Sequence, residues 1–380
     1  MDLPFIYDKS VVNKDFTGRK SECLAMSSLI ASGENTVLIE PPKSGKKSLI
    51  QQTLFDMRLN GKQFNTAIIK MFNIRETDRF LTRFGSTVIR SVASSPSEYE
   101  KIIEDNLSGT HFLFDRQRFA DCDEVLSLNW AADNNDMMAV FSLPYKIARE
   151  TGTKMIVVLD EFQSILAMDR SEALLSTFEA VVKAMTHKAD CSFIMTGSKV
   201  NAMKYIFCQK KYFYRNSELL PLQPIEERDL TEHIRKGFLK GGKEIEKELA
   251  IGVCRLFKGN IWYINHISAI CDSMSKGYIN EGIMMDALNA LISIHEPRFI
   301  SAMDSLTEYQ TSFLRAVLEG VTKFSSTDVI EKYALNSSAN VKRVKDALLK
   351  KEVITFDDND EPVILDSLFE YWAKKYYFEI

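Results

Sequence analysis

VLIEPPKSGKKSLI, from Val37 to Ile50, is the stretch that decides how this chain is interpreted. An apolar run is followed by two prolines, by Ser44-Gly45-Lys46 and by a segment with helical spacing. This is the order of a phosphate-binding loop, in which backbone N–H groups at the start of a helix hold an anion. Two positions depart from the pattern, because Glu40 replaces the first glycine and Lys47 replaces the Ser or Thr.

The loop still contains the groups that bind phosphate. Lys46 supplies a positive charge, Gly45 permits backbone conformations that other residues avoid, and the N–H groups around them can form an anion-binding nest. The two prolines lack N–H groups, but they precede the donors that the nest mainly needs. The candidate ligands are Pro42, Lys43, Ser44, Gly45, Lys46, Lys47, Ser48 and Leu49.

The magnesium site of this loop is in doubt. The Ser or Thr of the pattern normally ligates Mg²⁺. Ser48 cannot simply replace it, because one residue along a helix is a rotation of about 100°. The ammonium group of Lys47 could instead lie where the metal charge would be. For this segment alone, an ordinary strand and loop without a ligand is the alternative.

Two further apolar runs end in polar side chains. MIVVLDEF, from Met155 to Phe162, has the continuous apolar pattern of a strand buried on both faces and ends in Asp160 and Glu161. Adjacent acids at that position favour a functional site over an acidic surface turn. The run from Ser192 to Ser198 contains Thr196, where a group that contacts the γ-phosphate would lie.

From Val37 to about Leu220, short apolar runs alternate with helical segments, including a strand at Thr66–Phe72 and helices at Asp136–Thr151 and about Ala173–Ala189. This alternation predicts an α/β fold with a parallel sheet sandwiched by helices. We expect a core at 1–225, a lid of four helices at 226–300, and a winged helix with a C-terminal helix at 301–380.

These motifs resemble those of AAA+ and STAND-like P-loop ATPases, in particular the archaeal-type ATPases that end in a winged helix. The Walker A motif is degenerate at Glu40 and Lys47, and two further departures are Asn216 after Arg215 and Ile261 in place of a lid proline. The matching segments are FTGRKSE (16–22), the modified loop, VVLDEFQ (157–163), IMTGS (194–198), YR (214–215) and GNIWY (259–263).

The resemblance implies ATP or ADP as cofactor, with Mg²⁺ in doubt because of Lys47. Lys46 would hold the β and γ phosphates, Asp160 the metal and Glu161 the attacking water. Thr196 or Ser198 would contact the γ-phosphate. Gly18 and Arg19 would lie beside the adenine, and the lid would contribute Asn260 and Tyr263. Arg215 would be a sensor arginine or reach a neighbouring subunit, with a structural salt bridge as an equal alternative.

The composition is that of an ordinary globular protein. The 380 residues are 45% hydrophobic and carry a formal net charge of −4, which provides no long-range attraction for nucleic acid or an anionic membrane. No apolar stretch approaches the roughly 18 residues that a membrane span needs, and the start MDLPF lacks the features of a signal peptide. The six cysteines form no C-x-x-C pair. We expect a cytoplasmic protein that does not contact a membrane. We also expect no metal ion that is bound by protein side chains alone.

The segment 108–136 mixes aromatic with charged residues. Exposed aromatics would form a partner surface. The favoured interpretation is an insertion that folds its own aromatics onto the core.

The C-terminal region has the pattern of a winged helix, with helices at Glu308–Leu318, Ser326–Ala334 and Ser338–Lys350 and two strands around Asp357–Asp360. DNA could bind through 326–361, because the third helix is basic. The wing is acidic, however, and acids outnumber bases from Thr307 onward, which favours a protein partner or self-association. The candidate DNA contacts are Lys342, Arg343, Lys345, Lys350 and Lys351.

Three functions remain open at this point. The leading one is a slow ATPase or nucleotide-dependent switch that controls a winged-helix interaction domain, because the modified loop favours binding over fast hydrolysis. The second is a DNA-binding regulator that uses the ATPase fold as sensor or scaffold. The third is a nucleotide-free protein-interaction module in which Glu40 repels phosphate.

Overall fold

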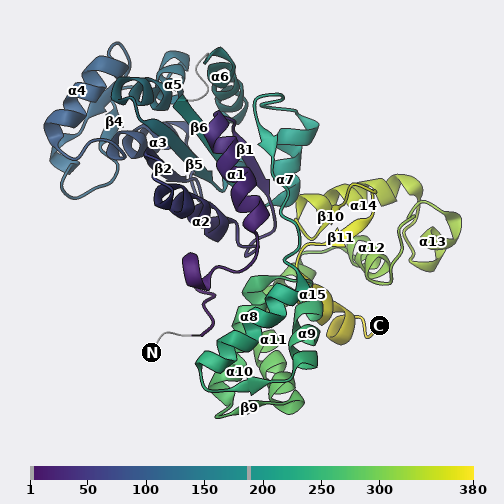
Figure 1. Ribbon diagram of the computed structural model, residues 1–380. Coiled ribbons are helices and arrows are strands. Elements are labelled where there is room, and N and C mark those ends of the chain that lie inside the picture. Colours follow the sequence, from purple (N-terminus) through teal and green to yellow (C-terminus); the bar gives the residue numbers. More distant parts are fainter. Residues whose placement is uncertain (1–3, 186–189) are drawn as a thin grey trace. The chain divides into compact units, whose positions relative to one another are not determined.

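The computed structural model of the chain describes residues 4–185 and 190–380 (Figure 1). Its contacts form two compact units. The sheet unit contains residues 20–40 and 52–222. The lid–wing unit contains the N-terminal segment to Arg19, the loop segment 41–51 and everything from Gln223 onward. The candidate phosphate-binding loop therefore groups with the lid and the winged helix.

A five-stranded sheet in the order β2-β5-β6-β1-β7 forms the centre of the sheet unit, and all of its pairings are parallel. The parallel register places Asp160, the last residue of β5, opposite Thr196 of β6. The predicted fold class is confirmed. The strands are β1 (Thr36–Ile39), β2 (Phe64–Lys70), β5 (Lys154–Asp160), β6 (Cys191–Gly197) and β7 (Glu218–Leu219).

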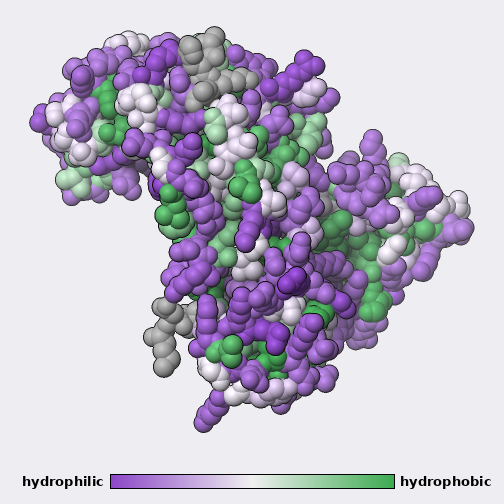
Figure 2. Space-filling model, in the orientation of Figure 1, coloured by the Kyte–Doolittle hydropathy of each residue, from purple (hydrophilic) through white to green (hydrophobic). Residues whose placement is uncertain are grey.

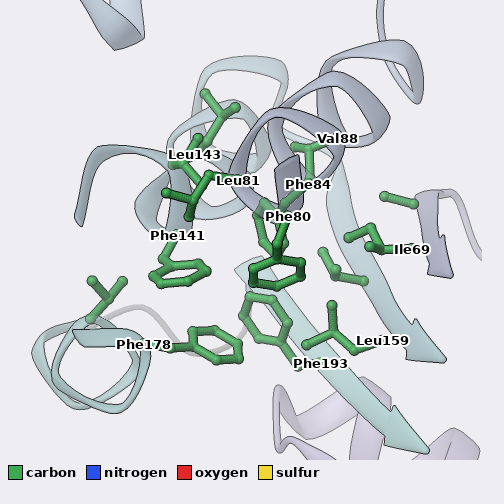
Figure 3. Packing of buried hydrophobic residues seen from close by; sticks show 14 of the residues in the cluster. Ile69, Phe80, Leu81, Phe84, Val88, Phe141, Leu143, Leu159, Phe178 and Phe193 are labelled. Atoms are coloured by element: carbon green, nitrogen blue, oxygen red, sulfur yellow. The ribbon is translucent and has the colours of Figure 1, made fainter. Parts of the chain in front are cut away.

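Strand β6 is buried along its whole length, and so is β5 after its first residue, as the continuous apolar runs predicted. Figure 3 shows how phenylalanines from helices and from β6 meet in this core. Phe178 packs against Phe141 and Phe193, with ring centroids 4.8 Å and 4.9 Å apart. Such pairs add roughly 0.5–1.5 kcal/mol each beyond the burial of their area. The helices of the sheet-forming part are α1 (Lys20–Ser32), α2 (Lys46–Leu59), α3 (Thr77–Arg90), α4 (Pro96–Leu107), α5 (Asn134–Thr151), α6 (Ser171–Ala184) and α7 (Val200–Lys204).

The segment 108–136 forms a small antiparallel hairpin, β3 (Phe112–Phe114) and β4 (Leu126–Leu128), with a short helix η2 (Arg116–Arg118) between its strands. The favoured interpretation of this insertion is confirmed, because its phenylalanines pack inward around Tyr99 of α4. Trp130 is the exception and is 74% exposed.

Three predicted boundaries in the sheet unit differ from the structure. Strand β2 lies two residues earlier than predicted and leaves Phe72 exposed. Helix α5 begins at Asn134, because Asp133 and Asp136 form a capping box at its start. Helix α6 ends at Ala184, and 186–189, predicted to continue it, lie outside the described residues.

The lid–wing unit begins with a short helix, η1 (Asn13–Asp15), and then contains the four lid helices that the sequence predicted. Phe5 of the N-terminal segment packs against Phe238 of the first lid helix, with ring centroids 4.8 Å apart. Glycines follow the ends of the first three lid helices. They are α8 (Glu227–Lys240), α9 (Lys247–Leu256), α10 (Ile261–Met274) and α11 (Glu281–Asp304), with a small parallel pair of strands, β8 (Glu244–Ile245) and β9 (Tyr278–Ile279).

The C-terminal region is a winged helix, as predicted. Helices α12 (Glu308–Leu318) and α14 (Ser338–Lys350) have the predicted bounds, and Thr307 and Ser337 cap their first turns. Helix α13 (Thr327–Lys332) is shorter than predicted. The wing is the antiparallel pair β10 (Ile354–Phe356) and β11 (Pro362–Ile364), followed by α15 (Ser367–Trp372) and a last π-helical turn, η6 (Ala373–Tyr377).

Hydrophilic residues cover most of the surface visible in Figure 2, and the apolar residues on that face form small separate groups. Among the described residues, no helix is both long enough and apolar enough to cross a membrane.

Candidate functional site

The loop between β1 and α2 has the backbone of a phosphate cradle. Gly45 adopts a φ of 91°, in the left-handed region that favours glycine, directly before the first turn of α2. The side chain of Lys46 is buried and folds back over the loop. Its Nζ donates to the carbonyl oxygen of Pro41 at 2.7 Å and lies 3.4 Å from Ser44 Oγ. These two contacts position the ammonium group at the loop.

The FTGRKSE motif lies beside this loop. The guanidinium group of Arg19 donates to the carbonyl oxygens of Ser44 at 3.3 Å and Gln223 at 3.1 Å. Gly18 has a φ of 68°, and a Cβ there would lie 2.7 Å from Ile225 Cγ2. Thr17 Oγ1 lies 2.9 Å from His233 Nδ1, where the N-terminal segment and α8 line a cavity of about 230 Å³. Contact of this motif with adenine remains a prediction.

The hydroxyl group that the loop lacks is not supplied by the next residue. Ser48 Oγ accepts a hydrogen bond from the backbone N–H of Val11 at 3.1 Å. This bond connects the N-terminal segment to the start of α2. Lys47 is exposed. The loop therefore fits phosphate, whereas its magnesium position lacks the usual serine or threonine ligand.

The two acids after β5 differ in their surroundings. Asp160 is 7% exposed, and its carboxylate accepts a hydrogen bond from Thr196 Oγ1 at 3.3 Å. This contact follows from the sheet register, because the two residues are opposite each other at the carboxyl ends of adjacent strands. The structure thus brings together Asp160 and Thr196, two of the predicted site residues.

The backbone of Glu161 is left-handed rather than extended. Its φ is 61°, in the left-handed region, and it precedes the short helix η3 (Phe162–Ala167). One carboxylate oxygen accepts hydrogen bonds from Ser198 Oγ at 2.5 Å, Ser198 N–H at 3.3 Å and Gln163 Nε2 at 2.6 Å. Gly197 leaves room for this arrangement, because a Cβ there would lie 2.5 Å from Gln163 Oε1.

Glu40 has a structural contact in the sheet unit. Its carboxylate accepts a hydrogen bond from the backbone N–H of Leu222 at 3.3 Å, and its own N–H reaches the carbonyl oxygen of Gly197 at 3.5 Å. The acid at the first motif position therefore links the end of β1 to the segment that follows β7.

Arg215 lies in the segment after the π-helical turn η5 (Tyr205–Gln209) and is exposed, with a φ of 61°. Its guanidinium carbon lies 5.4 Å from the centroid of the Tyr214 ring. Within the described part of the chain it makes no ion pair, so the structural salt bridge offered as an alternative is not found there.

The GNIWY motif forms the start of lid helix α10. Asn260 caps the helix, because its side-chain oxygen accepts the N–H groups of Trp262 at 3.0 Å and Tyr263 at 3.2 Å. Tyr263 is buried, and its hydroxyl donates to Asp366 at 2.8 Å. Ile261, which replaces the expected proline, packs near Gly45 of the loop, 3.9 Å from where a Cβ would lie.

A contact between loop and lid was not predicted from the motifs. Lys43 Nζ lies 3.3 Å from the centroid of the Trp262 ring. Burial first and the nearby Arg298 second lower the pKa of Lys43 to about 8. A basic residue in the loop and an aromatic residue in the lid motif were the available signals, but no local pattern joins them.

One group of side chains in the described residues has ligand atoms close enough for a metal, namely His111, Asp133 and Asp136. Hydrogen bonds already occupy these atoms. Asp136 accepts from Asp133 N–H and from His111 N–H and lies 2.8 Å from His111 Nδ1, while Asp133 accepts from Asp136 N–H. The group serves the start of α5 and gives no reason to assign a metal.

Known structures share this arrangement of elements. The Walker-type ATPase PABY2304 of Pyrococcus abyssi aligns with a TM-score of 0.66 and 16% identity over 97% of this chain and 99% of that chain. The ORC2 protein of Aeropyrum pernix, in its ADPNP-ADP complexes, aligns with a TM-score of 0.56 and 13% identity over 95% of this chain and 93% of that chain. The comparison with curated proteins finds no matching sequence.

Residues 297–375 match the family model described as a probable winged helix domain. This match covers α12 to α15 and the wing between them. The resemblance inferred from the motifs is confirmed at the level of the fold. The chain has the fold of Walker-type and ORC-type ATPases, and its C-terminal region is a winged helix domain.

Proposed function

We propose that this protein binds ATP or ADP at the loop 40–48 and acts as a slow ATPase or nucleotide-dependent switch that controls its winged helix domain. The observation that carries the proposal is the loop itself. Gly45 has the left-handed conformation, α2 begins directly after it, and the buried Lys46 ammonium group lies over the loop. Backbone N–H groups, a helix N-terminus and a cation then converge on one anion position.

We assign the following roles to the side chains around the loop and at the ends of β5 and β6. Lys46 would hold the β and γ phosphates, and Thr196 or Ser198 would contact the γ-phosphate. Asp160 would hold Mg²⁺, which when bound offsets charge on the transferred phosphoryl group. Glu161 would orient the attacking water.

Three features favour slow turnover. The loop lacks the hydroxyl ligand because Lys47 occupies its position, and Ser48 is bonded to Val11. One oxygen of the Glu161 carboxylate already accepts three hydrogen bonds from Ser198 and Gln163, so protein donors occupy an oxygen that could otherwise accept a hydrogen bond from the attacking water. A flexible ammonium group also lacks the octahedral geometry that a bound magnesium ion provides.

Calorimetric titration with ATP, with and without Mg²⁺, tests the proposal. We expect saturable binding that changes little on omission of Mg²⁺. Lys46→Ala should weaken it by about 10- to 100-fold, because a charge-assisted hydrogen bond contributes roughly 1.5–3 kcal/mol. Lys62→Ala, at an exposed lysine beyond the end of α2, is the matched control and should bind as the parent does. Absence of ATP binding in the parent would leave the nucleotide-free interaction module as the better account.

The contacts of the winged helix favour a protein partner or a second copy over DNA. Lys345 of α14 pairs with Asp360 of the wing at 3.3 Å, and its Nζ lies 3.5 Å from the centroid of the Phe356 ring. Arg343 donates to Asn340, and Lys351 donates to the carbonyl oxygen of Ser305. Three of the five candidate DNA contacts are therefore engaged within the domain.

Fluorescence anisotropy with duplex DNA at two salt concentrations tests this point. We expect weak binding at low salt that vanishes near physiological salt. Tight binding with a steep salt dependence would instead support the DNA-binding regulator. The cytoplasmic location predicted from the sequence stays a prediction.

A further inference from the structure

The Lys43 ammonium group has an unusual place for a loop cation. It lies over the face of Trp262 at 3.3 Å from the ring centroid, and the Tyr263 ring centroid is 6.0 Å away. Within the described residues Lys43 makes no ion pair. The backbone at Lys43 has a φ of 66°, so the residue projects from a left-handed turn of the loop. Its charge therefore lies against an aromatic face, with the Asp366 carboxylate as an attractive charge in the surroundings.

Trp262 is the second residue of α10 and is half-buried. Its ring meets the Tyr263 ring edge to face, with centroids 5.1 Å apart. It also contacts the buried rings of His266 and His295, with centroids 5.0 Å and 5.6 Å away. The indole is thus packed against side chains of its own helix and of α11, and a change in its position has to be accommodated by both helices.

Tyr263 connects this packing to the winged helix domain. Its hydroxyl donates to Asp366 at 2.8 Å, and Arg298 of α11 donates to Asp366 at 2.8 Å and also to the tyrosine oxygen. Asp366 caps α15, because its carboxylate accepts the N–H groups of Leu368 and Phe369 at 3.0 Å and 3.2 Å. The contacts from loop to winged helix therefore form a continuous series within one compact unit.

A second contact joins the region of the GNIWY motif to α15. Lys258, directly before the GNIWY motif, has its Nζ 2.5 Å from the carboxylate of Glu370 in α15. The start of α10 and the start of α15 are thus linked on both sides of the motif.

A phosphate group competes with Trp262 for Lys43. The attraction of an ammonium group to an aromatic face is weaker than a charge-assisted hydrogen bond to a phosphate oxygen. Burial first and the nearby Arg298 second lower the pKa of Lys43 to about 8, and an anionic phosphate would oppose this shift by favouring the charged ammonium group.

We propose that Lys43 exchanges between the Trp262 ring and a nucleotide phosphate, and that this exchange reports the occupancy of the loop to the winged helix through Tyr263 and Asp366. The proposal rests on the proposed nucleotide binding and adds its route of regulation. The coupling between nucleotide at the loop and the winged helix cannot exceed the free energy of the exchanged contact. This corresponds to a factor of about two to thirty in an equilibrium constant. By linkage, a partner that shifts the Asp366 network changes nucleotide affinity by the same factor.

Tryptophan emission during a titration with ATP tests the first step. The chain has three tryptophans, so the Trp262 signal is taken as the part that disappears in Trp262→Phe. We expect ATP to change this emission in the parent. At saturating ATP, Lys43→Met should lose the change, whereas Lys62→Met should keep it. Calorimetric binding without a Trp262-dependent change in the parent would overturn the proposal and leave nucleotide binding intact. No calorimetric binding would remove the proposed function and this inference with it.

Hydrogen exchange at the N–H groups of Leu368 and Phe369 tests the second step. We expect saturating ATP to change their exchange rates by about two- to thirtyfold in the parent. Tyr263→Phe keeps the ring and removes the hydroxyl group, so the Trp262 emission change should persist while the response in α15 is lost. An equal response in α15 for the parent and Tyr263→Phe would overturn the route through Asp366.

Discussion

Lys47 is the residue on which the chemistry of this loop depends. The loop keeps its glycine, its buried lysine and the helix start, which together bind charge. It lacks a hydroxyl group at the one position where a magnesium ligand is expected, and Ser48 is committed to Val11. Under the proposed function, nucleotide binding and hydrolysis would be separated at this single side chain.

Replacing Lys47 with threonine should raise ATP turnover in the presence of Mg²⁺ by at least about tenfold. The reason is that the hydroxyl ligand lets the metal offset charge on the transferred phosphoryl group. Steady-state phosphate release measures this. Lys47→Ala removes the ammonium group without adding a ligand and should not reproduce the gain. Unchanged or lower turnover in Lys47→Thr would contradict the account.

Gly18 illustrates a different constraint, in which one backbone position permits the approach of two segments. Gly18→Ala should lower the free energy of unfolding by about 2–3 kcal/mol, because a left-handed φ and a close contact with Ile225 both oppose a Cβ. Gly61→Ala is the matched control, since Gly61 has a φ of 73° and nothing within 4 Å of the added carbon.

Denaturant unfolding of both variants separates the two effects. The control should lose only about 1 kcal/mol from backbone strain. Equal losses would show that the contact with Ile225 relaxes without cost.

Among the elements, the lid helices α10 and α11 meet through neutral histidines. Burial first, with Arg298 and Lys43 nearby, lowers the pKa of His295 to about 4, and burial lowers the pKa of His266. His266 Nδ1 and His295 Nε2 are buried without a hydrogen-bond partner in the described structure. Neutral rings fit this packing, whereas charged rings would not.

The stability of the lid should therefore fall as the pH falls from about 6.5 toward 4. In this window the unfolded chain binds a proton at His295 and the folded chain does not, so acid favours unfolding. His295→Leu should make the decline in melting temperature shallower. His111→Gln is the comparison, because hydrogen bonding to Asp136 raises the pKa of His111 and moves its effect above pH 6.5. A slope unchanged in His295→Leu would contradict this prediction.

For the whole molecule, the grouping of the loop with the lid and winged helix has a thermodynamic consequence. Residues 41–51 and the N-terminal segment contact the lid helices within one compact unit. Nucleotide bound at the loop should therefore stabilise that unit directly. The stabilisation is set by mass action and by the fraction of sites occupied.

ATP at about 100 times its dissociation constant should raise the free energy of unfolding of the lid–wing unit by about 2.7 kcal/mol. Hydrogen exchange resolved by segment measures this, with protection expected in α8 and α10. Lys46→Ala at the same ATP concentration should show a smaller gain. Equal protection in the parent and in Lys46→Ala would place the bound nucleotide elsewhere.

Much of the fold was predictable because it depends on local patterns. The apolar runs at β5 and β6, and the caps at Thr307 and Ser337, specify their elements through burial and hydrogen bonding of nearby residues. The order of motifs also indicated the candidate nucleotide site and the positions at which it departs from the Walker A pattern. Boundaries were less predictable, as at β2, where a strand continues only as long as its neighbour pairs with it.

The sequence by itself determined the loop chemistry, the missing hydroxyl group, the acidic pair after β5 and the winged helix at the C-terminus. Only the tertiary structure decided that Ser48 bonds to Val11, that Ser198 holds Glu161 and that Lys43 lies on Trp262. Each of these contacts joins a side chain to a group in a different segment of the chain. Their formation depends on how helices and strands pack rather than on the spacing of residues along the chain, so no local pattern encodes them.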